Sequence, residues 1–301
     1  MPWDTDAFWR LLKQTMRSWL GDYAPSMGAA LAYYTLFSLA PLLLIVIAVA
    51  GLIFGEDAAR GEIALQLSAL MGEGGAKAVQ DLLSSVDKPL EGSVATIVGL
   101  LMLVVGATTV FAELQDSLDR IWHVPARESR PGWLMLVRAR LLSFGMILAI
   151  GFLLIVSLVV SSVLGAMGSW LQPLFGGWLT LAAAVNAVGS FLMVTAMFAL
   201  IYKVMPRVQV QWQDVWTGAV FTATLFTFGK FLIGLYIGRS GAITGFGAAG
   251  SLVVVLLWVY YSAQIFLIGA EFTWVYANAY GSRQPLPAKD GAVPSVMTGP
   301  A

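Results

Sequence analysis

The last long hydrophobic segment, residues 249–276, limits most strongly what this chain can fold into. It begins with an unbroken apolar run after Ser251 and reaches a single carboxylate, Glu271, near its end. A bilayer core of ~30 Å requires about 20 apolar residues in a helix, and this segment is longer. A glycine-rich stretch, residues 240–251, precedes it. The segment therefore predicts a membrane-spanning helix with two features that are costly in lipid, a flexible entry and a carboxylate.

Composition assigns the whole chain to the integral membrane proteins. Of its 301 residues, 58% are hydrophobic and 11% are charged, whereas soluble domains carry about 25% charged residues. The formal net charge is zero, which gives no bulk attraction to nucleic acid. The absence of cysteine and the single histidine, His123, exclude disulfides, a thiol nucleophile and a zinc site built on paired histidines or cysteines. We expect no cofactor, no bound metal and no nucleic-acid partner.

Hydropathy predicts an all-α integral membrane protein whose membrane domain, residues 28–280, has six transmembrane helices. Residues 1–27 place apolar and basic side chains on different helical faces, which predicts an amphipathic helix lying at the membrane interface. The polar tail, residues 281–301, is expected to be disordered. The six expected spans are residues 28–54, 93–112, 141–168, 179–202, 215–237 and 249–276.

The distribution of basic residues predicts the orientation. Most Lys and Arg residues lie in the N-terminal helix, in the connectors after the second and fourth spans, and in the tail. We therefore expect both termini and the tail to be cytoplasmic. The acidic stretch 55–91 and the glycines of 240–251 then face outward. Within 55–91 we expect two short amphipathic helices split at residues 72–75, so the first outer loop is helical.

Two polar residues inside the spans are candidates for substrate contact. Lys230 lies about seven residues, roughly 10 Å, inside the outer boundary, and Asn186 lies at a similar depth. An ionisable group left in lipid costs at least ~2.5–3.5 kcal/mol. Three interpretations stay open: the lysine stem reaches the outer interface, Lys230 hydrogen-bonds to Asn186, or the two bind an anionic head group.

A second set of charged residues lies near the cytoplasmic boundary. Three carboxylates there, Glu113, Asp116 and Asp119, fall along one side of a helix. Because Arg120 can pair with Asp116, a salt-bridge network is favoured over a metal site. Glu271 is expected to form an ion pair with Lys203, Arg138 or Arg140, or, if it is buried without such a partner, to suit proton coupling. The complete inner charge layer is Glu113, Asp116, Asp119, Glu271, Lys203, Arg138 and Arg140.

Proline and glycine mark where the backbone can bend. A proline inside the first span, Pro41, predicts a kink, which serves either packing alone or gating. Asp22 or Ser26 is expected to cap the helix of that span. The glycines of 240–251 can let this segment fold back into the outer leaflet. The gating candidates are Pro41, Gly241, Gly245, Gly247 and Gly250.

No catalytic motif is present. The sequence has no phosphate-binding loop, no GxSxG and no HExxH motif, so we assign no catalytic residue and expect a protein that is not an enzyme. Within the third span, Ser157, Ser161, Gly165 and Ser169 recur every four residues. Such a stripe predicts close helix packing and is compatible with a homo-oligomer.

Two stretches carry a resemblance to a known family. The first reads Ala29-Ala-Leu-Ala-Tyr-Tyr-Thr-Leu-Phe-Ser-Leu-Ala-Pro-Leu42. The second reads Gly247-Ala-Ala-Gly-Ser-Leu-Val-Val-Val-Leu-Leu-Trp-Val-Tyr-Tyr-Ser-Ala-Gln264 and continues as Gly269-Ala-Glu-Phe-Thr-Trp-Val-Tyr-Ala277. Both are similar to the signature of the YihY/virulence factor BrkB family of bacterial inner-membrane proteins. Ile121-Trp122 also fits, although Asp119 stands shortly before this pair where many relatives have asparagine.

The resemblance implies a multi-pass protein of the bacterial inner membrane. The family was once labelled ribonuclease BN, a label later withdrawn, and the single histidine agrees with the withdrawal. Family members have been linked to envelope phenotypes, and movement of lipid or lipopolysaccharide precursors has been proposed for some. We therefore expect a transporter or exporter of an amphipathic anionic lipid or related envelope solute, with membrane lipids as partners. The alternatives are a structural or scaffold membrane protein and, less favoured, a lipid-modifying enzyme.

Overall fold

Helices form all the regular secondary structure in the residues that the computed structural model describes, which are 5–86, 109–124, 178–239 and 250–283. A helical stretch covers residues 109–121. Within the described residues three segments are long and apolar enough to cross a membrane: Ala187–Val204, Trp212–Tyr236 and Gly250–Ala279. The labelled helices are α1 (Thr5–Gly21), α2 (Ala24–Phe54), α3 (Glu56–Val86), α6 (Trp178–Val204), α7 (Trp212–Arg239) and α9 (Gly250–Ala279).

Four predicted spans coincide with helices. They are α2, α6, α7 and α9, and most of them extend a few residues beyond the predicted bounds. Such extension is expected, because a helix does not stop where the apolar run stops. The predicted span 141–168 and most of 93–112 lie outside the described residues, as do residues 284–301 of the predicted tail. The all-α prediction is thus confirmed for the described residues, and the number of six spans stays a prediction.

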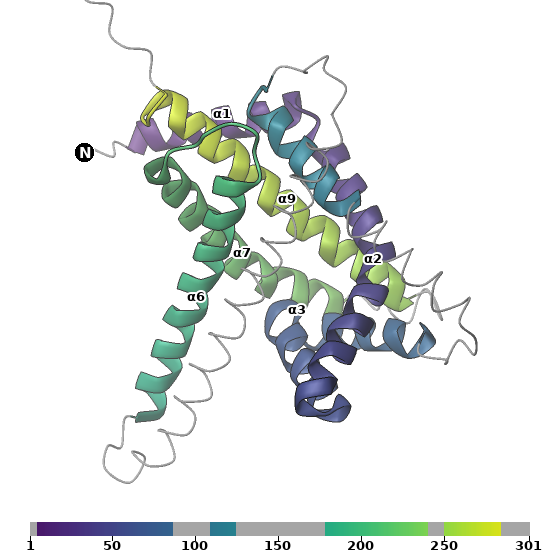
Figure 1. Ribbon diagram of the computed structural model, residues 1–301. Helices are drawn as coiled ribbons and strands as arrows, with labels where there is room; N and C mark the ends of the chain where they lie inside the picture. The colour runs from purple at the N-terminus through teal and green to yellow at the C-terminus, as the bar shows by residue number, and fades with distance from the viewer. Residues whose placement is uncertain (1–4, 87–108, 125–177, 240–249, 284–301) are drawn as a thin grey trace, which may run out of the picture.

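The central helix is α9. It packs against α1, α2, α3 and α7, and α7 packs in turn against α6 (Figure 1). A helix that is apolar on all sides is expected to be surrounded by others. Three apolar clusters follow one another along α9 and join it to its neighbours. In the first, Val254, Val255 and Trp258 pack against α2 and α3. In the second, Ala263, Leu267 and Ala270 pack against α2, α6 and α7, and in the third, Phe272, Val275 and Tyr276 pack against α1.

Glycines let α9 approach its neighbours closely. A Cβ atom at Gly218 of α7 would overlap the Thr273 side chain, and one at Gly28 of α2 would overlap the Gln264 amide. The same amide donates a hydrogen bond to the Pro25 carbonyl oxygen at 3.4 Å. Small residues allow this approach between helices in lipid. The contact of α2 with Gln264 joins the second stretch that carries the family resemblance to the residues directly before the first stretch, which begins at Ala29.

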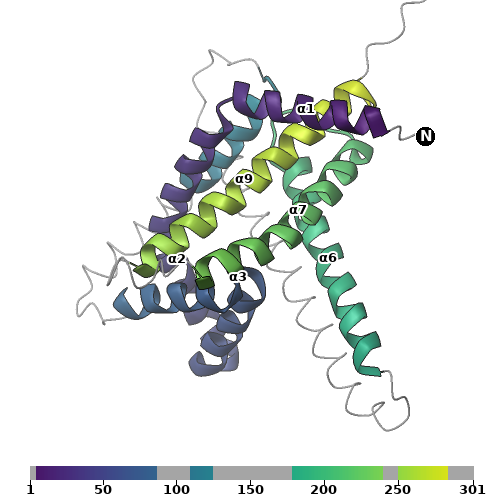
Figure 2. The ribbon, with the colours of Figure 1, turned by 180° about the vertical axis from the view of Figure 1, so that it is seen from behind.

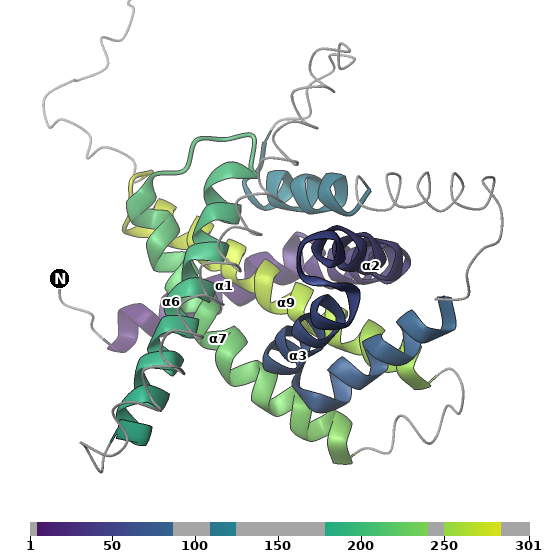
Figure 3. The same cartoon turned by 60° about the horizontal axis from the view of Figure 1, so that its bottom comes forward.

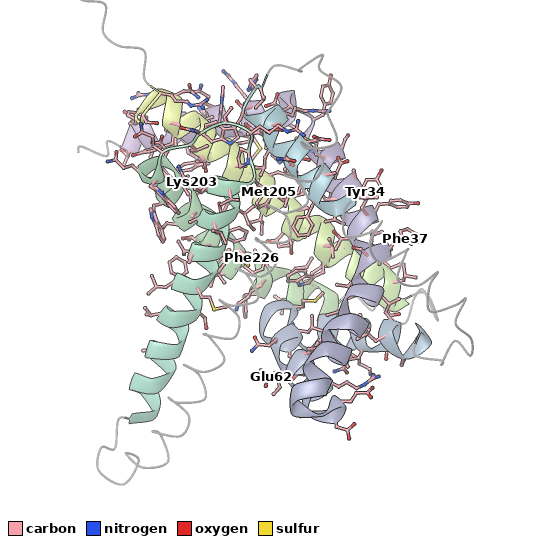
Figure 4. All side chains as sticks on the ribbon, in the orientation of Figure 1. Tyr34, Phe37, Glu62, Lys203, Met205 and Phe226 are labelled. Carbon is pink, nitrogen blue, oxygen red and sulfur yellow. The ribbon has the colours of Figure 1, made fainter. Side chains whose placement is uncertain are left out.

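The two ends of the molecule are built differently. At the α1 end, α1 lies across the last turns of α9, and at the α3 end, α3 lies beside the beginning of α9 (Figures 1 and 2). Lys203, at the end of α6, lies toward the α1 end, and Glu62 of α3 lies toward the other (Figure 4). The N-terminal helix and the acidic stretch 55–91, which were expected on opposite sides of the membrane, therefore lie at opposite ends of the structure.

The predicted helix within residues 1–27 is present as α1, although it ends earlier, at Gly21. Leu11 and Thr15 are buried, and Leu11 packs against α9, while Phe8 and Trp9 are exposed. The amphipathic character of α1 and its position at a membrane interface stay predictions.

The stretch expected to form a helical outer loop is α3. Gly72 has φ 76° and ψ 170° and separates two helical halves, as the glycines of residues 72–75 predict. Met71, Val79 and Leu83 are buried in the cluster with α9. The loop is therefore a packed part of the fold, because its apolar face is covered by the central helix.

The start of α2 differs from the prediction. The residue that precedes it, Tyr23, has φ 59°, and no side chain caps the first turn. The expected cap by Asp22 or Ser26 is therefore wrong. The left-handed turn at Tyr23 is followed by Pro25, whose nitrogen carries no hydrogen to donate to a capping side chain. Further along, α2 continues through Pro41, and Figure 1 shows the helix axis bending between its two ends. The Pro41 side chain lies outside the described residues, so its gating role stays a prediction.

Candidate functional site

Acidic side chains from three separate segments are buried at the α1 end, and a fourth, Asp22, is partly buried beside them. Glu271 of α9 is 0% exposed, Asp214 of α7 is 1% exposed, and Asp119 of the 109–121 helix is 7% exposed. The Asp22 side chain, from the turn between α1 and α2, is 18% exposed. Because burying a charge is costly unless it is paired, the partners of each carboxylate indicate what it does.

Asp119 has a structural partner, the loop that follows α6. It accepts a hydrogen bond from the Arg207 backbone N–H at 2.8 Å, and its other oxygen lies 3.2 Å from the Arg207 guanidinium. Asp116 lies 3.6 Å from the same guanidinium. The expected pairing of Arg120 with Asp116 is thus replaced by Arg207, because the loop folds over this helix. Glu113 lies half-buried on the same helix.

Burial raises the pKa of Asp119. The hydrogen bond from the Arg207 backbone and the charge of its guanidinium lower that pKa, and the nearby Asp116 carboxylate raises it. Loss of hydration thus disfavours the ionised form more than Arg207 favours it.

Asp214 joins the start of α7 to the end of α9. It accepts hydrogen bonds from the Ser282 hydroxyl at 2.5 Å and from the Ser282 backbone N–H at 3.3 Å. A Cβ atom at Gly281 would overlap the Asp214 carboxylate, so only glycine fits there without a shift. Next to this junction Arg283 lies 4.8 Å from the centre of the Trp122 ring. The sequence interpretation missed Asp214, although an acidic residue in the first turn of a helix is a recognisable stabilising signal.

Lys203 does not pair with Glu271. Its ammonium donates a hydrogen bond to the Val210 carbonyl oxygen at 2.5 Å and lies 5.5 Å from the centre of the Trp212 ring. The lysine is in the last turn of α6 and is turned toward the following loop, which corrects the predicted Lys203–Glu271 ion pair. The other predicted partners, Arg138 and Arg140, lie outside the described residues.

Asp22 and Glu271, which we call the acid pair, lack such partners. Both carboxyl oxygens of Glu271 and one of Asp22 are buried without a hydrogen-bond partner among the residues that the structure describes. The two carboxyl groups are close enough for a mutual hydrogen bond and for charge repulsion. His123 Nε2 lies 3.9 Å from the second Asp22 oxygen. Sequence reasoning considered Asp22 only as a helix cap, and nothing local to Asp22 indicates its contact with α9.

His123 is held in a defined orientation beside the acid pair. Its backbone has φ 51°, its ring stacks on Trp274 with 4.9 Å between ring centres, and Nδ1 lies 3.0 Å from the Ile121 carbonyl oxygen. Nε2 is therefore the ring nitrogen that faces Asp22. Within the described residues no group of three or more His, Cys, Asp or Glu side chains is arranged to hold a metal ion.

The outer candidates lie on α6 and α7. Lys230 is exposed on α7, next to exposed Phe228 and Phe231. Asn186 belongs to α6, and its side chain lies outside the described residues. The two helices cross and pack together, with the ring centres of Phe198 and Phe226 5.8 Å apart, and the beginning of α6 points away from the end of α7 (Figures 1, 2 and 3). The contact of Lys230 with Asn186 stays a prediction.

The glycine candidates are described only in part. Gly250 is buried at the start of α9. Gly241, Gly245 and Gly247 lie outside the described residues, so their role in gating stays a prediction.

Long apolar helices around a glycine-packed central helix define a multi-helical membrane protein. The chain belongs to the family described as Virulence factor BrkB, whose profile matches residues 15–293. The resemblance noted from the residues of α2 and α9 is thereby confirmed.

Several bacterial relatives carry the name UPF0761 membrane protein. The chain is 29% identical over 289 residues to one from Tolumonas auensis, covering 92% of this chain and 88% of the relative. It is 28% identical over 273 residues to one from Verminephrobacter eiseniae, covering 88% and 62%, respectively. It is 30% identical over 274 residues to one from Alcanivorax borkumensis, covering 88% and 59%. This chain thus spans less than two thirds of the last two relatives. No solved structure matches it.

Proposed function

We propose that this protein moves an amphipathic anionic lipid, or a related envelope solute, across the bacterial inner membrane. The observation that carries the proposal is Lys230, a cation exposed on a helix long and apolar enough to span a bilayer.

The surroundings of Lys230 support contact with lipid. Phe228 is 64% exposed, Phe231 is 68% exposed and Tyr236 is 59% exposed on the same helix. In a bilayer, such a surface meets acyl chains, and an ammonium within it attracts the phosphate of an anionic head group. Asn186 would add a hydrogen bond to the same head group when the substrate lies between α6 and α7.

The proposed orientation places the α1 end in the cytoplasm. The α1 helix exposes Arg10, Lys13 and Arg17 together with Phe8 and Trp9, a combination that suits an anionic membrane surface. The α3 end, with Glu56, Asp57, Glu73 and Asp81 exposed, would face outward. As part of this proposal, Pro41, Gly241, Gly245, Gly247 and Gly250 would be the gating positions, because proline and glycine allow a backbone to bend.

The direct test measures movement of fluorescent phosphatidylglycerol between the leaflets of vesicles that contain the purified protein. We expect Lys230→Ala and Lys230→Met to slow this movement, because both remove the charge, and Lys230→Arg to retain it. Fluorescent phosphatidylcholine, which has no net charge, should move more slowly and respond less to the substitutions. The matched control is Lys77→Met, which removes an exposed lysine of α3.

Unchanged movement in both Lys230 variants would exclude the proposed contact. If the wild-type protein moves none of these lipids, the scaffold alternative is favoured. That alternative predicts that substitutions on the exposed apolar surface change association of copies of the chain and leave lipid movement unaffected.

A further inference from the structure

We propose that the acid pair, Asp22 and Glu271, is a proton-binding site that holds one proton between its two carboxyl groups and exchanges it with the solvent through His123. The inference concerns proton binding at the α1 end and stands apart from the lipid contact proposed at Lys230.

The geometry leaves three buried oxygen atoms to be satisfied. They are the two carboxyl oxygens of Glu271 and one of Asp22, and none has a donor among the described residues. Glu271 is 0% exposed. Two carboxylates cannot both ionise at close range in a buried place without strong repulsion. A single proton on Glu271, donated in a hydrogen bond to Asp22, removes the repulsion. It also gives one oxygen of Glu271 and one oxygen of Asp22 a hydrogen-bond partner.

The other charged groups at this end are directed elsewhere. From α6, Lys203 is turned to Val210 and Trp212. From the loop that follows, Arg207 is turned to Asp119 and Asp116. From the start of α7, Asp214 is turned to Ser282, and from the end of α9, Arg283 is turned to Trp122. The basic residues of α1 (Arg10, Lys13 and Arg17) are exposed. Among the described residues, His123 is the titratable group that faces the pair.

A gradient of exposure leads from the solvent to the pair. The side chain of His123 is 56% exposed, that of Asp22 is 18% exposed, and Glu271 is fully buried. The Nδ1 atom of His123 is engaged with the Ile121 carbonyl oxygen, so Nε2 faces Asp22 at 3.9 Å. A small side-chain movement or one water molecule bridges that distance. A proton accepted by Nε2 passes to Asp22 and then to Glu271, and each step moves one proton without any other reactant.

Infrared spectroscopy tests the proposal because a protonated carboxylic acid and a carboxylate absorb at different frequencies. We expect the protein in lipid nanodiscs at neutral pH to show a protonated carboxyl band that Glu271→Gln abolishes. Asp22→Asn should shift or remove the same band, because it changes the acceptor. Asp214→Asn is the matched control, since it removes a buried acid that has structural partners, and it should leave the band unchanged.

Two outcomes would overturn the proton site. Absence of the band in the wild-type protein would mean that Glu271 is ionised, as expected if Arg138 or Arg140 pairs with it. A band that neither Glu271→Gln nor Asp22→Asn alters would assign it to other groups. Exchange of potassium for sodium should change nothing, and a sodium-dependent loss of the band would assign the site to sodium.

The route through His123 has its own measurement. In D2O the carboxyl band shifts as deuterium replaces the proton. His123→Gln should keep the band and slow that shift, because glutamine does not take up a proton. A shift as fast as in the wild-type protein would overturn the assigned route.

Discussion

Two regions of the α1 end each contain acidic side chains withdrawn from solvent, but they differ in the hydrogen-bond donors that these side chains receive. Asp214 and Asp119 receive donors from Ser282 and Arg207, so they join separate segments of the chain. The acid pair receives no donor from the described residues, apart from the more distant His123. Both regions lie beside the same central helix. The difference shows that burial alone does not reveal the role of a carboxylate, and that its partners do.

A buried carboxylate with good donors stabilises the fold, because removing it leaves those donors unsatisfied. A buried carboxyl group that is neutral and hydrogen-bonded to another acid can be replaced by an amide of the same shape at little cost. Substitution of Asp214 or Asp119 should therefore lower the free energy of unfolding more than substitution of the acid pair does.

The largest effect is expected for Asp214→Ala. It removes the acceptor for the Ser282 hydroxyl and backbone N–H at the junction of α7 and α9, and we expect a loss of about 2–3 kcal/mol in the free energy of unfolding. The measurement is a denaturant titration in mixed detergent micelles. Ser282→Ala, which removes only one donor, should cost about 1 kcal/mol. Equal effects of the two variants would show that the carboxylate has no role beyond the hydroxyl contact.

An intermediate effect is expected for Arg207→Gln. Its guanidinium is half-exposed, so solvent weakens the ion pair with Asp119, and we expect a loss of about 1 kcal/mol in the same titration. The backbone hydrogen bond to Asp119 remains in this variant. Arg120→Gln is the matched control, because Arg120 is an exposed arginine on the Asp119 helix, and it should change stability by less than about 0.5 kcal/mol. A larger loss of stability in Arg120→Gln than in Arg207→Gln would instead support the pairing of Asp116 with Arg120 that the sequence predicts.

A smaller effect concerns pH. The pKa of Asp119 is raised in the folded state, chiefly by burial, so the folded protein binds this proton more tightly than the unfolded chain does. The resulting stabilisation is fully present below the ordinary pKa of 3.8 and is lost as pH rises through the raised pKa. The free energy of unfolding of wild type, measured against that of Asp119→Asn, should show this loss as the pH rises in acidic solution. In Arg207→Gln the loss should occur at higher pH, because the charge of Arg207 lowers the pKa of Asp119. An opposite slope would mean that Arg207 outweighs burial.

The smallest effect is expected at the acid pair. Glu271→Gln should leave the free energy of unfolding within about 0.5 kcal/mol of wild type, because glutamine resembles the neutral acid and can donate to Asp22. Asp119→Asn and Asp214→Asn measured alongside provide the contrast. Destabilisation by Glu271→Gln as large as that by Asp214→Asn would remove the distinction between the two regions.

Much of the architecture could be predicted from the sequence. The apolar runs predict α2, α6, α7 and α9 within a few residues, and the glycines of residues 72–75 predict the break in α3. These signals are local, since a run of apolar residues or a positive φ depends on neighbours along the chain. The family resemblance was likewise carried by contiguous residues and is confirmed over residues 15–293.

The partners of the charged residues could not be predicted in the same way. The sequence placed Asp119 and Glu271 in one inner layer but paired Asp116 with Arg120 and treated Asp22 as a helix cap. In the structure, Arg207 is 88 residues from Asp119 in the chain and Ser282 is 68 residues from Asp214. Sequence spacing identifies only neighbours on the same helix. Which loop folds over which helix end decides the other pairings.

The sequence by itself determined that this is a helical membrane protein with a carboxylate in its last hydrophobic segment, because length, hydropathy and glycine content are properties of contiguous residues. Only the tertiary structure decided that this segment is the central helix and that its carboxylate meets a second acid from the turn between α1 and α2. The physical reason is that α9 is packed against α1 and α2 at once, with Gly28 beneath Gln264. That packing brings Asp22 to Glu271 and leaves the pair without a donor from the described residues.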